Sequence, residues 1–318
     1  MALGNPDHPV GGLSVRRPAG VELRPLGRED FAVALAMARE LYGLPDSDPE
    51  PHRAAYEAYV NDPDAAPFMA VADGEPAGII LFRFRRRLNR ATYEGWVSDL
   101  VVRERFRRRG IGRMLLKAVV EEWRLRQGHA LVLEAGNDRN AAAQLYAAAG
   151  FRETERLWEM VPLRATTPPD GPALLRALST DDVEAVTRLL AELGRPAPTL
   201  ERMPAVERTF AQLLRARDQR SLLAEIDGAV AGVVVAELRR SFYVLEPQLW
   251  ISELLVTEPA RGRGIGRQLL AKALANAAND DAYGASITSA STRLAAERLL
   301  RAAGFEDVGA GYLLERSR

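Results

Sequence analysis

Two stretches of this chain, WVSDLVV at residues 96–102 and WISELLV at residues 250–256, are near copies of each other and decide the fold. Every position in the first stretch maps to the position 154 residues later, and 13 of the 21 positions from 96 to 116 are identical to their counterparts. The same offset joins Gly78 to Gly232 upstream. A register kept over this distance indicates an internal duplication, so we expect two copies of one folding unit.

The duplication predicts the domain organisation. We expect residues 1–20, which are rich in glycine and proline, to form a flexible tail. A first domain then covers 21–163 and a second covers 173–318, and each is expected to be a complete folding unit. Residues 164–172 contain three prolines and one glycine, a composition that suits a linker.

Composition excludes several classes of function. The chain has 43 Lys+Arg and 43 Asp+Glu residues, and a formal net charge of zero does not favour a partner such as nucleic acid. It has no cysteine and only three scattered histidines, so we expect no metal site. No apolar run approaches the ~18 residues of a membrane-spanning helix, and the start of the chain lacks the apolar core of a signal peptide. We therefore expect a cytoplasmic protein with no membrane partner.

Hydrophobic periodicity predicts the elements of the first half. Strands are expected at 21–26, 68–72, 77–84, 96–102 and 130–135, with two short strands within 151–163. Helices are expected at 28–41, 51–60, 112–127 and 140–149. The second half repeats this order. The predicted fold class is α/β (α+β), with two domains that each contain a mixed, mostly antiparallel twisted sheet and helices on both faces.

In each half a strand runs into an Arg-x-x-Gly-x-Gly segment and then a helix. The first N–H groups of a helix lack internal partners, glycine lets the backbone approach a ligand, and arginine adds charge-assisted contacts. A single such loop could be an ordinary strand-to-helix turn, but two in equivalent positions favour a seat for a pyrophosphate. The predicted binding residues are Arg107, Arg108, Arg109, Gly110, Ile111, Gly112 and Arg113, and their counterparts Arg261, Gly262, Arg263, Gly264, Ile265, Gly266 and Arg267.

Another arginine-rich run, at residues 83–87, is expected to be an edge strand whose long side chains face water.

The segments DLVV at 99–102 and RRRGIG at 107–112 resemble motif A of the Gcn5-related N-acetyltransferase (GNAT) superfamily. The later segment 137–151, with NDRN at its start and YAAAGF at its end, is similar to motif B. The resemblance implies that acetyl-CoA lies in a V-shaped opening between strands 96–102 and 130–135. It implies that the remaining coenzyme contacts come from Leu100, Val101, Val102, Asn137 and Asn140, and in the second half from Leu254, Leu255 and Val256.

The resemblance also implies roles in catalysis. Tyr146 matches the general acid that protonates the departing thiolate. Asp99 is the first candidate for the base that deprotonates the amine, because the family often has an acidic residue in this strand, and Glu94 is the second. Purely structural roles remain open for these residues: Asp99 could pair with an arginine, Tyr146 could pack against the sheet, and Asn140 could cap a helix.

The halves differ at these positions. Tyr146 maps to Leu300, Asn137 to Ser291 and Asn140 to Leu294, whereas Asp99 maps to Glu253. We therefore expect that only the first half catalyses acetyl transfer. The residues expected around the acceptor are Tyr42, Tyr56, Tyr59, Glu153, Glu155 and Trp158.

The sequence thus predicts an acetyl-CoA-dependent N-acetyltransferase that moves an acetyl group to the primary amine of a small molecule or peptide, by direct attack on the thioester. Two alternatives remain. One is a non-catalytic acyl-CoA-binding sensor or scaffold, which the altered second half supports. The other is a tandem acetyltransferase that resembles mycothiol synthase, in which the second half would be the active one.

Overall fold

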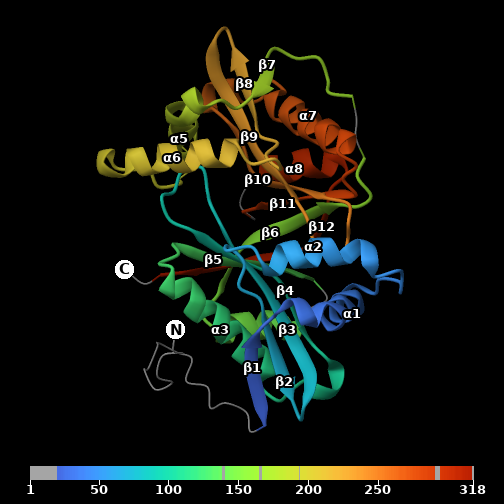
Figure 1. The fold of residues 1–318 in the computed structure, drawn as a ribbon. Helices are drawn as coiled ribbons and strands as arrows, with labels where there is room; N and C mark the ends of the chain where they lie inside the picture. Colours follow the sequence, from blue (N-terminus) through green and yellow to red (C-terminus); the bar gives the residue numbers. More distant parts are fainter. Residues whose placement is uncertain (1–19, 138–139, 165–166, 193, 291–293, 317–318) are drawn as a thin grey trace.

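The computed structural model describes residues 20–137, 140–164, 167–192, 194–290 and 294–316 (Figure 1). The predicted tail therefore lies outside these ranges, apart from Gly20. The strands of the first half are β1 (Val21–Pro25), β2 (Phe68–Ala72), β3 (Glu75–Arg85), β4 (Glu94–Val102), β5 (Ala130–Gly136) and β6 (Arg152–Met160). Its helices are α1 (Phe31–Tyr42), α2 (Glu50–Val60), α3 (Ile111–Leu125) and α4 (Asn140–Ala148).

The second half repeats this order. Its strands are β7 (Leu174–Ala177), β8 (Leu222–Ile226), β9 (Ala229–Arg239), β10 (Gln248–Val256), β11 (Gly284–Ser289) and β12 (Glu306–Glu315). Its helices are α5 (Val183–Glu192), α6 (Met203–Leu214), α7 (Ile265–Asn279) and α8 (Leu294–Ala303). Over the described ranges no helix is long and apolar enough to cross a lipid bilayer.

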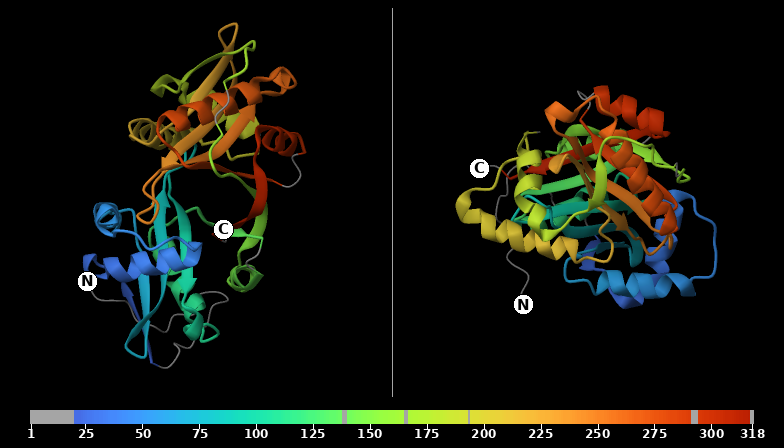
Figure 2. Two further views of the ribbon diagram at one scale, coloured as in Figure 1. Left: turned by 90° about the vertical axis from the view of Figure 1, so that its right-hand side faces the viewer. Right: turned by 90° about the horizontal axis from the view of Figure 1, so that it is seen from above.

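All the strands of the described chain join one twelve-stranded sheet, in the order β1-β2-β3-β4-β5-β12-β6-β11-β10-β9-β8-β7. Only β4–β5 and β10–β11 are parallel pairs, so the sheet is mostly antiparallel. Helices cover both faces, and the two halves lie at opposite ends of the sheet (Figures 1 and 2). The predicted fold class, with two α/β domains that each have a mostly antiparallel sheet, is confirmed.

The final strands of the two halves are exchanged. β12, from the second half, pairs with β5 and β6, and β6, from the first half, pairs with β11 and β12. The expectation that each half is a complete folding unit is therefore wrong, because each sheet is completed by a strand from the other half. The expectation of two short strands at 151–163 is also wrong, since this segment forms one strand, and the exchanged strand takes the place of the second.

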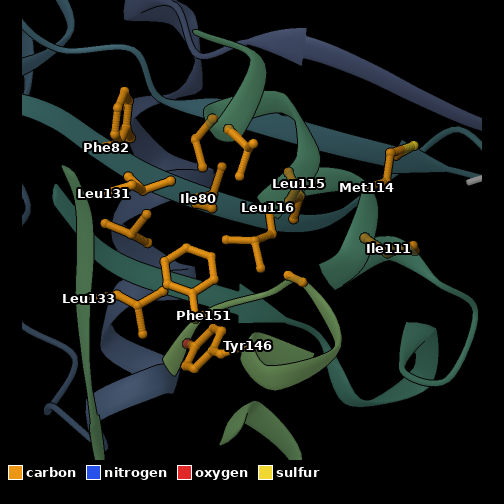
Figure 3. Close-up of a cluster of buried hydrophobic side chains, with 14 of the residues drawn as sticks. Ile80, Phe82, Ile111, Met114, Leu115, Leu116, Leu131, Leu133, Tyr146 and Phe151 are labelled. Carbon is orange, nitrogen blue, oxygen red and sulfur yellow. The ribbon is translucent and has the colours of Figure 1, made fainter. Parts of the chain in front are cut away.

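Each helix is positioned by an apolar stripe that packs on the sheet. In α3 the buried residues Ile111, Leu115 and Val119 recur at four-residue spacing, so they share one face of the helix. This face and α4 cover one side of the first half, where they form a core with the strands (Figure 3). α1 and α2 cover the other side, around Tyr56 and Met69.

Loops cross between the halves in the same reciprocal way as the strands. Phe242, from the segment between β9 and β10, is buried in the core formed by α1 and α2 of the first half. Its counterpart 154 residues earlier, Leu88, is buried in the core formed by α5 and α6 of the second half. Each core thus contains a buried side chain from the other half, so this face of each half is built jointly.

The arginine-rich run at 83–87 does not face water as expected. Most of it belongs to β3, which pairs with β2 and β4 and is not an edge strand. The side chains of Arg85 and Arg87 are only 11% and 21% exposed, because the second half covers them. The guanidinium of Arg239 lies 4.0 Å from the ring centroid of Trp96 and 3.7 Å from that of Trp250, so the interface is a stack of arginines and tryptophans.

Candidate active site

The strands β4 and β5 separate partway along their length. Their parallel pairing runs from Glu94 opposite Ala130 to Val97 opposite Leu133 and stops there, although both strands continue. The register of β4 against β3 shifts at Ser98, which forms a bulge that bends β4 at the same point. The strands at 96–102 and 130–135 therefore diverge to form a V-shaped opening of the kind that the resemblance implies.

The second half has the same opening. The pairing of β10 with β11 runs from Gln248 opposite Gly284 to Ile251 opposite Ile287, and the bulge falls at Ser252. The same backbone arrangement is thus present in both halves, so the side chains around it distinguish them.

The start of α3 has the geometry of an anion-binding site. Gly110, at the N-cap, has a φ of 78°. This left-handed backbone favours glycine. Its counterpart Gly264 has a φ of 82° before α7. The first N–H groups of both helices lack helical partners and carry partial positive charge, which suits a phosphate.

The next glycine of each loop lies against a neighbouring helix. A Cβ added to Gly112 would lie 3.3 Å from Cδ2 of Leu145 on α4, and one on Gly266 would lie 3.4 Å from Cδ2 of Leu299 on α8. These glycines therefore allow two helices to pack closely. Contact between their backbone and a coenzyme stays a prediction.

The arginines of the first loop also differ among themselves. Nε of Arg107 donates to the carbonyl of Val102 at 3.1 Å, which ties the loop back to the end of β4. Arg109 pairs with Asp73 in the turn between β2 and β3, at 2.7 Å. In the second half Arg261 makes the same bond to the end of β10 as Arg107 does to β4.

Arg108 is held in a strained conformation. Its φ is 64°, in the left-handed region that residues with a Cβ rarely adopt, and its counterpart Gly262 has a φ of 77°. The loop thus requires this conformation in both halves, but only the first half carries a side chain there. Strain kept by a charged residue at a loop of this kind is typical of a functional site.

Two asparagines follow β5. The backbone N–H of Asn137 donates to the carbonyl of Val308 at 2.9 Å, so the exchanged strand β12 fixes the end of β5. Asn140 is exposed and begins α4. The counterpart of Asn137, residue 291, lies outside the described residues, and Leu294 begins α8.

Tyr146 lies in the core beneath the separated strands and is 6% exposed (Figure 3). Its ring lies 6.2 Å from that of Phe151 and 5.4 Å from that of Tyr312, measured between centroids. Tyr312 belongs to β12, so the second half supplies one wall of this site. The counterpart Leu300 is equally buried but has no hydroxyl.

Asp99 is 5% exposed and accepts two tyrosine hydroxyls on the same oxygen. The hydroxyl of Tyr42 donates to Oδ1 at 2.5 Å and that of Tyr243 at 2.9 Å. Tyr42 ends α1 of the first half, whereas Tyr243 comes from the second half. These two contacts join Asp99 to tyrosines from both halves of the chain.

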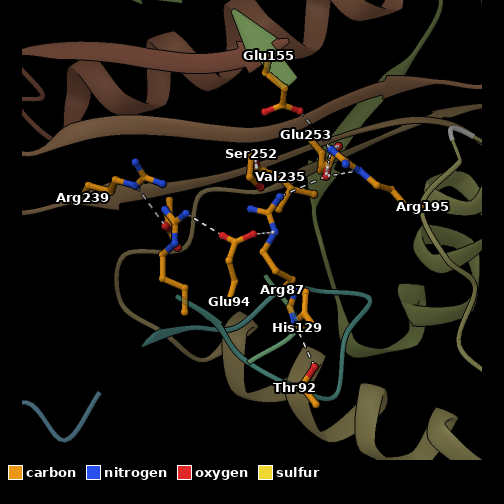
Figure 4. A network of polar contacts seen from close by, with 12 residues as sticks. Arg87, Thr92, Glu94, His129, Glu155, Arg195, Val235, Arg239, Ser252 and Glu253 are labelled. Carbon is orange, nitrogen blue, oxygen red and sulfur yellow. Dashed lines mark hydrogen bonds and ion pairs between the residues drawn. The ribbon is translucent and has the colours of Figure 1, made fainter. Parts of the chain in front are cut away.

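The counterpart carboxylate is surrounded by positive charge (Figure 4). Glu253 accepts hydrogen bonds from Nη2 of Arg87 at 3.4 Å and from Nε of Arg195 at 3.1 Å. The carboxylate that the sequence keeps in the second half is thus engaged by two guanidinium groups, one from each half.

Glu94 is similarly bound (Figure 4). It lies at the start of β4, away from the opening, and Nη2 of Arg85 donates to it at 2.7 Å. Burial alone would raise the pKa of Glu94, yet the charges of Arg87 and Arg85 hold it below its usual value. This environment favours an ion pair within the interface between the halves.

Sequence reasoning missed Glu134. It follows Leu133, the last residue of β5 that pairs with β4, so it stands where the opening begins. Nε1 of Trp96 donates to its Oε2 at 2.8 Å. Burial raises the pKa of Glu134 to about 7, although Arg85 and Trp96 act in the opposite direction. A comparison of the two halves could have identified Glu134, because the second half has Thr288, which has no carboxylate, at the corresponding position.

Within the described ranges no group of three or more His, Asp or Glu side chains could hold a metal ion.

The sequence profile of the acetyltransferase (GNAT) family matches residues 34–151 and again 186–305. The chain belongs to the GNAT family. Members of the family in general use acetyl-CoA and act on small-molecule or peptide amines.

Several known proteins resemble this tandem GNAT chain. A mycothiol acetyltransferase from Cellulomonas flavigena is 31% identical over 197 residues, which cover 56% of this chain and 55% of the relative. The chain thus matches about half the length of this curated relative.

Solved structures resemble the whole tandem GNAT fold. A GCN5-related N-acetyltransferase from Sphaerobacter thermophilus has a TM-score of 0.62 at 22% identity, with 94% of this chain and 96% of that chain covered. A tandem GNAT protein from the clavulanic acid biosynthesis pathway has a TM-score of 0.60 at 18% identity, with 94% and 99% covered. At these identities the likeness shows the fold alone.

Proposed function

We propose that this tandem GNAT protein transfers an acetyl group from acetyl-CoA to a primary amine and that the chemistry takes place in the first half. The observation that carries the proposal is Glu134, a half-buried carboxyl group whose pKa is raised to about 7 and whose Oε2 accepts from Trp96 at the start of the opening, where the second half has Thr288. Tyr146, matched by Leu300, supports the same assignment.

Acetyl-CoA binding is assigned to the opening between β4 and β5 and to the start of α3 in the first half. The N–H groups at the start of α3 would hold the pyrophosphate, with the side chain of Arg108 alongside. The pantetheine arm would lie along Leu100, Val101 and Val102, at the edge of β4 that no longer pairs with β5. Asn140, exposed at the start of α4, is in a position to contact it.

The base is assigned to Glu134. An alkylammonium has a pKa of about 10.4 and must lose a proton before it can attack. A carboxylate with a pKa near the working pH is well matched to remove it, directly or through water. Asp99 is the less suitable candidate because its Oδ1 already accepts two hydroxyls, and Glu94 because it pairs with Arg85.

Attack on the thioester and departure of the thiolate follow, with every proton accounted for. The free amine attacks the thioester carbonyl, the C–N bond forms, and the backbone N–H of Val102 is placed to stabilise the oxyanion. When the C–S bond breaks, Tyr146 gives its proton to the sulfur and regains one from the nitrogen as the amide forms. The proton that Glu134 took from the ammonium passes to solvent.

The second half is assigned a binding role without turnover. It keeps the opening and the left-handed glycines Gly262 and Gly264, but it lacks counterparts of Glu134 and Tyr146. The arginines around Glu253 would also repel a cationic amine.

A second candidate is acetyl transfer of the kind named for the mycothiol acetyltransferase relative. The 31% identity over 197 residues favours including its substrate among the acceptors tested. In that case too, the side chains described above favour the first half as the active one. A non-catalytic acyl-CoA sensor has no need for a tyrosine beside the sulfur or a carboxyl group of raised pKa.

The test is acetyl-CoA turnover against a panel of primary amines, with coenzyme binding stoichiometry measured by calorimetry. Glu134→Gln and Tyr146→Phe should each lower kcat at least tenfold, while Thr288→Ala, the matched change in the second half, should leave it unchanged. Turnover that survives both first-half changes but is lost on Gly264→Val would move the chemistry to the second half. No binding of acetyl-CoA at all would refute the proposal.

A further inference from the structure

The acceptor side of the first half contains a pair of stacked tyrosines that come from different halves of the chain. The rings of Tyr42 and Tyr243 are 5.2 Å apart between centroids and only 18° from parallel. Both hydroxyls donate to Oδ1 of Asp99, at 2.5 Å and 2.9 Å. Two flat rings are thus fixed edge-on to one buried carboxylate.

The position of Tyr243 is set by its neighbours in the second half. Phe242 is buried against the rings of Tyr56 and Tyr59, and its carbonyl lies 2.8 Å from Nδ1 of His52. Ser241 closes the turn by accepting from the backbone N–H of Val244 at 3.0 Å. The segment is anchored on both sides of Tyr243, so its ring is preorganised and does not need to be ordered by a ligand.

One carboxylate lies directly against this pair. Asp99 is 5% exposed and accepts both hydroxyls on Oδ1. Burial, Asp99 and Tyr42 together raise the pKa of Tyr243 well above its usual value, so its hydroxyl stays protonated and acts as a fixed donor. A buried carboxylate beside aromatic faces attracts a cation and disfavours an anion.

The second half lacks this arrangement. The counterparts of Phe242 and Tyr243 are Leu88 and Asn89, so no aromatic ring stands at the equivalent place. The counterpart of Asp99, Glu253, is bound by arginines. The stacked pair is thus confined to the half to which catalysis is assigned.

We propose that Tyr243 is a specificity residue of the first-half site and that, with Tyr42 and Asp99, it selects a cationic primary amine carried on an aromatic or otherwise flat apolar body. Tyr42 is 45% exposed, so one face of the pair is open to an incoming molecule. The ring face would hold the apolar body, and the charge of Asp99 would attract the ammonium group. Tyr243 is a positioning residue, because Glu134 and Tyr146 handle the protons. This inference rests on the proposed function.

The test uses the full chain with phenethylamine and glucosamine as probes, an aromatic and a hydrophilic primary amine. Binding is measured by ligand-observed NMR in the presence of coenzyme A, and KM and kcat are measured where turnover occurs. Tyr243→Leu should weaken phenethylamine binding about tenfold and glucosamine binding much less, with kcat and acetyl-CoA affinity nearly unchanged. Tyr243→Phe keeps the ring and should keep most of the selectivity.

Asn89→Ala, the same position in the other half, is the matched control and should change neither probe. Thermal unfolding of each variant checks that the fold is intact, and Tyr243→Phe serves if Tyr243→Leu fails to fold. Failure of wild type to bind phenethylamine, or an equal loss for both amines in Tyr243→Leu, would overturn the inference. The proposed function fails on a different result, namely turnover that does not depend on Glu134 and Tyr146.

Discussion

Replacing Glu134 with glutamine should lower activity and raise stability, and both effects should depend on pH. Glutamine has nearly the same shape and can still accept from Nε1 of Trp96, which donates to Glu134 at 2.8 Å. It cannot take up a proton or carry a charge. The change therefore removes the titration of one group and leaves the packing of the opening in place.

The magnitude follows from the pKa of Glu134, which burial raises from 4.5 to about 7. Below pH 4.5 the carboxyl group is protonated in both the folded and the unfolded chain and contributes nothing. Between pH 4.5 and 7 the unfolded chain loses its proton while the folded chain keeps it, so wild type loses stability as pH rises. At 1.36 kcal/mol per pKa unit the loss reaches about 3 kcal/mol above pH 7.

Two assays test this reasoning. Urea unfolding at pH 4, 6 and 8 should show that Glu134→Gln gains stability over wild type with rising pH, up to about 3 kcal/mol. The kcat/KM of wild type should rise with pH around 7, whereas that of the variant should be at least tenfold lower and should follow the amine's own ionisation instead.

Glu237→Gln is the matched control, since burial also raises the pKa of Glu237, which lies on β9 of the second half. It should gain stability in the same direction but keep full activity. Equal stability of Glu134→Gln and wild type at every pH would refute the buried titration. An unchanged pH–rate profile in Glu134→Gln would refute its role as the base.

Three further changes test other parts of the structure. Arg108→Gly should raise the unfolding free energy by about 1 kcal/mol in urea titrations, because it relieves a positive φ of 64°, yet weaken acetyl-CoA binding by calorimetry. Gly262→Ala should have the opposite sign on stability, about 1 kcal/mol lower, since its φ is 77°. Ending the chain at Gly304 should unfold the first half as well as the second by circular dichroism, because β12 pairs with β5 and β6; a first half that kept its structure would contradict the strand exchange.

Most of the fold could be predicted from the sequence, because hydrophobic periodicity and the glycines that end helices are local signals. The expected helix at 112–127 is α3 (Ile111–Leu125), and its end follows from Gly128, whose N–H bonds back to the carbonyl of Trp123 at 3.1 Å. The repeat register also located both loops that carry glycine at the start of a helix. These features depend on residues close together in the chain, so one half is enough to identify them.

The strand exchange could not be predicted in this way. β6 and β12 have the alternating pattern of a strand whichever half they join, since the pattern fixes which face is buried and not which neighbour pairs with it. The apolar residue that each strand delivers, Trp158 to the second half and Tyr312 to the first, is buried in either topology. The duplication itself favoured the wrong conclusion, because two similar units need not be two separate ones.

The same exchange explains why the sequence placed only part of the site. Sequence reasoning found Tyr146 and Asp99 by their positions in the first half, but their neighbours Tyr312 and Tyr243 come from the second. A duplicated chain that shares strands and loops in this way cannot lose one half without opening the site in the other. If the first half is the active one, as proposed, the second half can lack a counterpart of Tyr146 and still be needed, since its strand β12 and Tyr243 complete the first half. On this reasoning, changes at Tyr312, whose ring lies 5.4 Å from that of Tyr146, should lower kcat more than changes at Leu300, whereas changes at Tyr243 should act on acceptor binding.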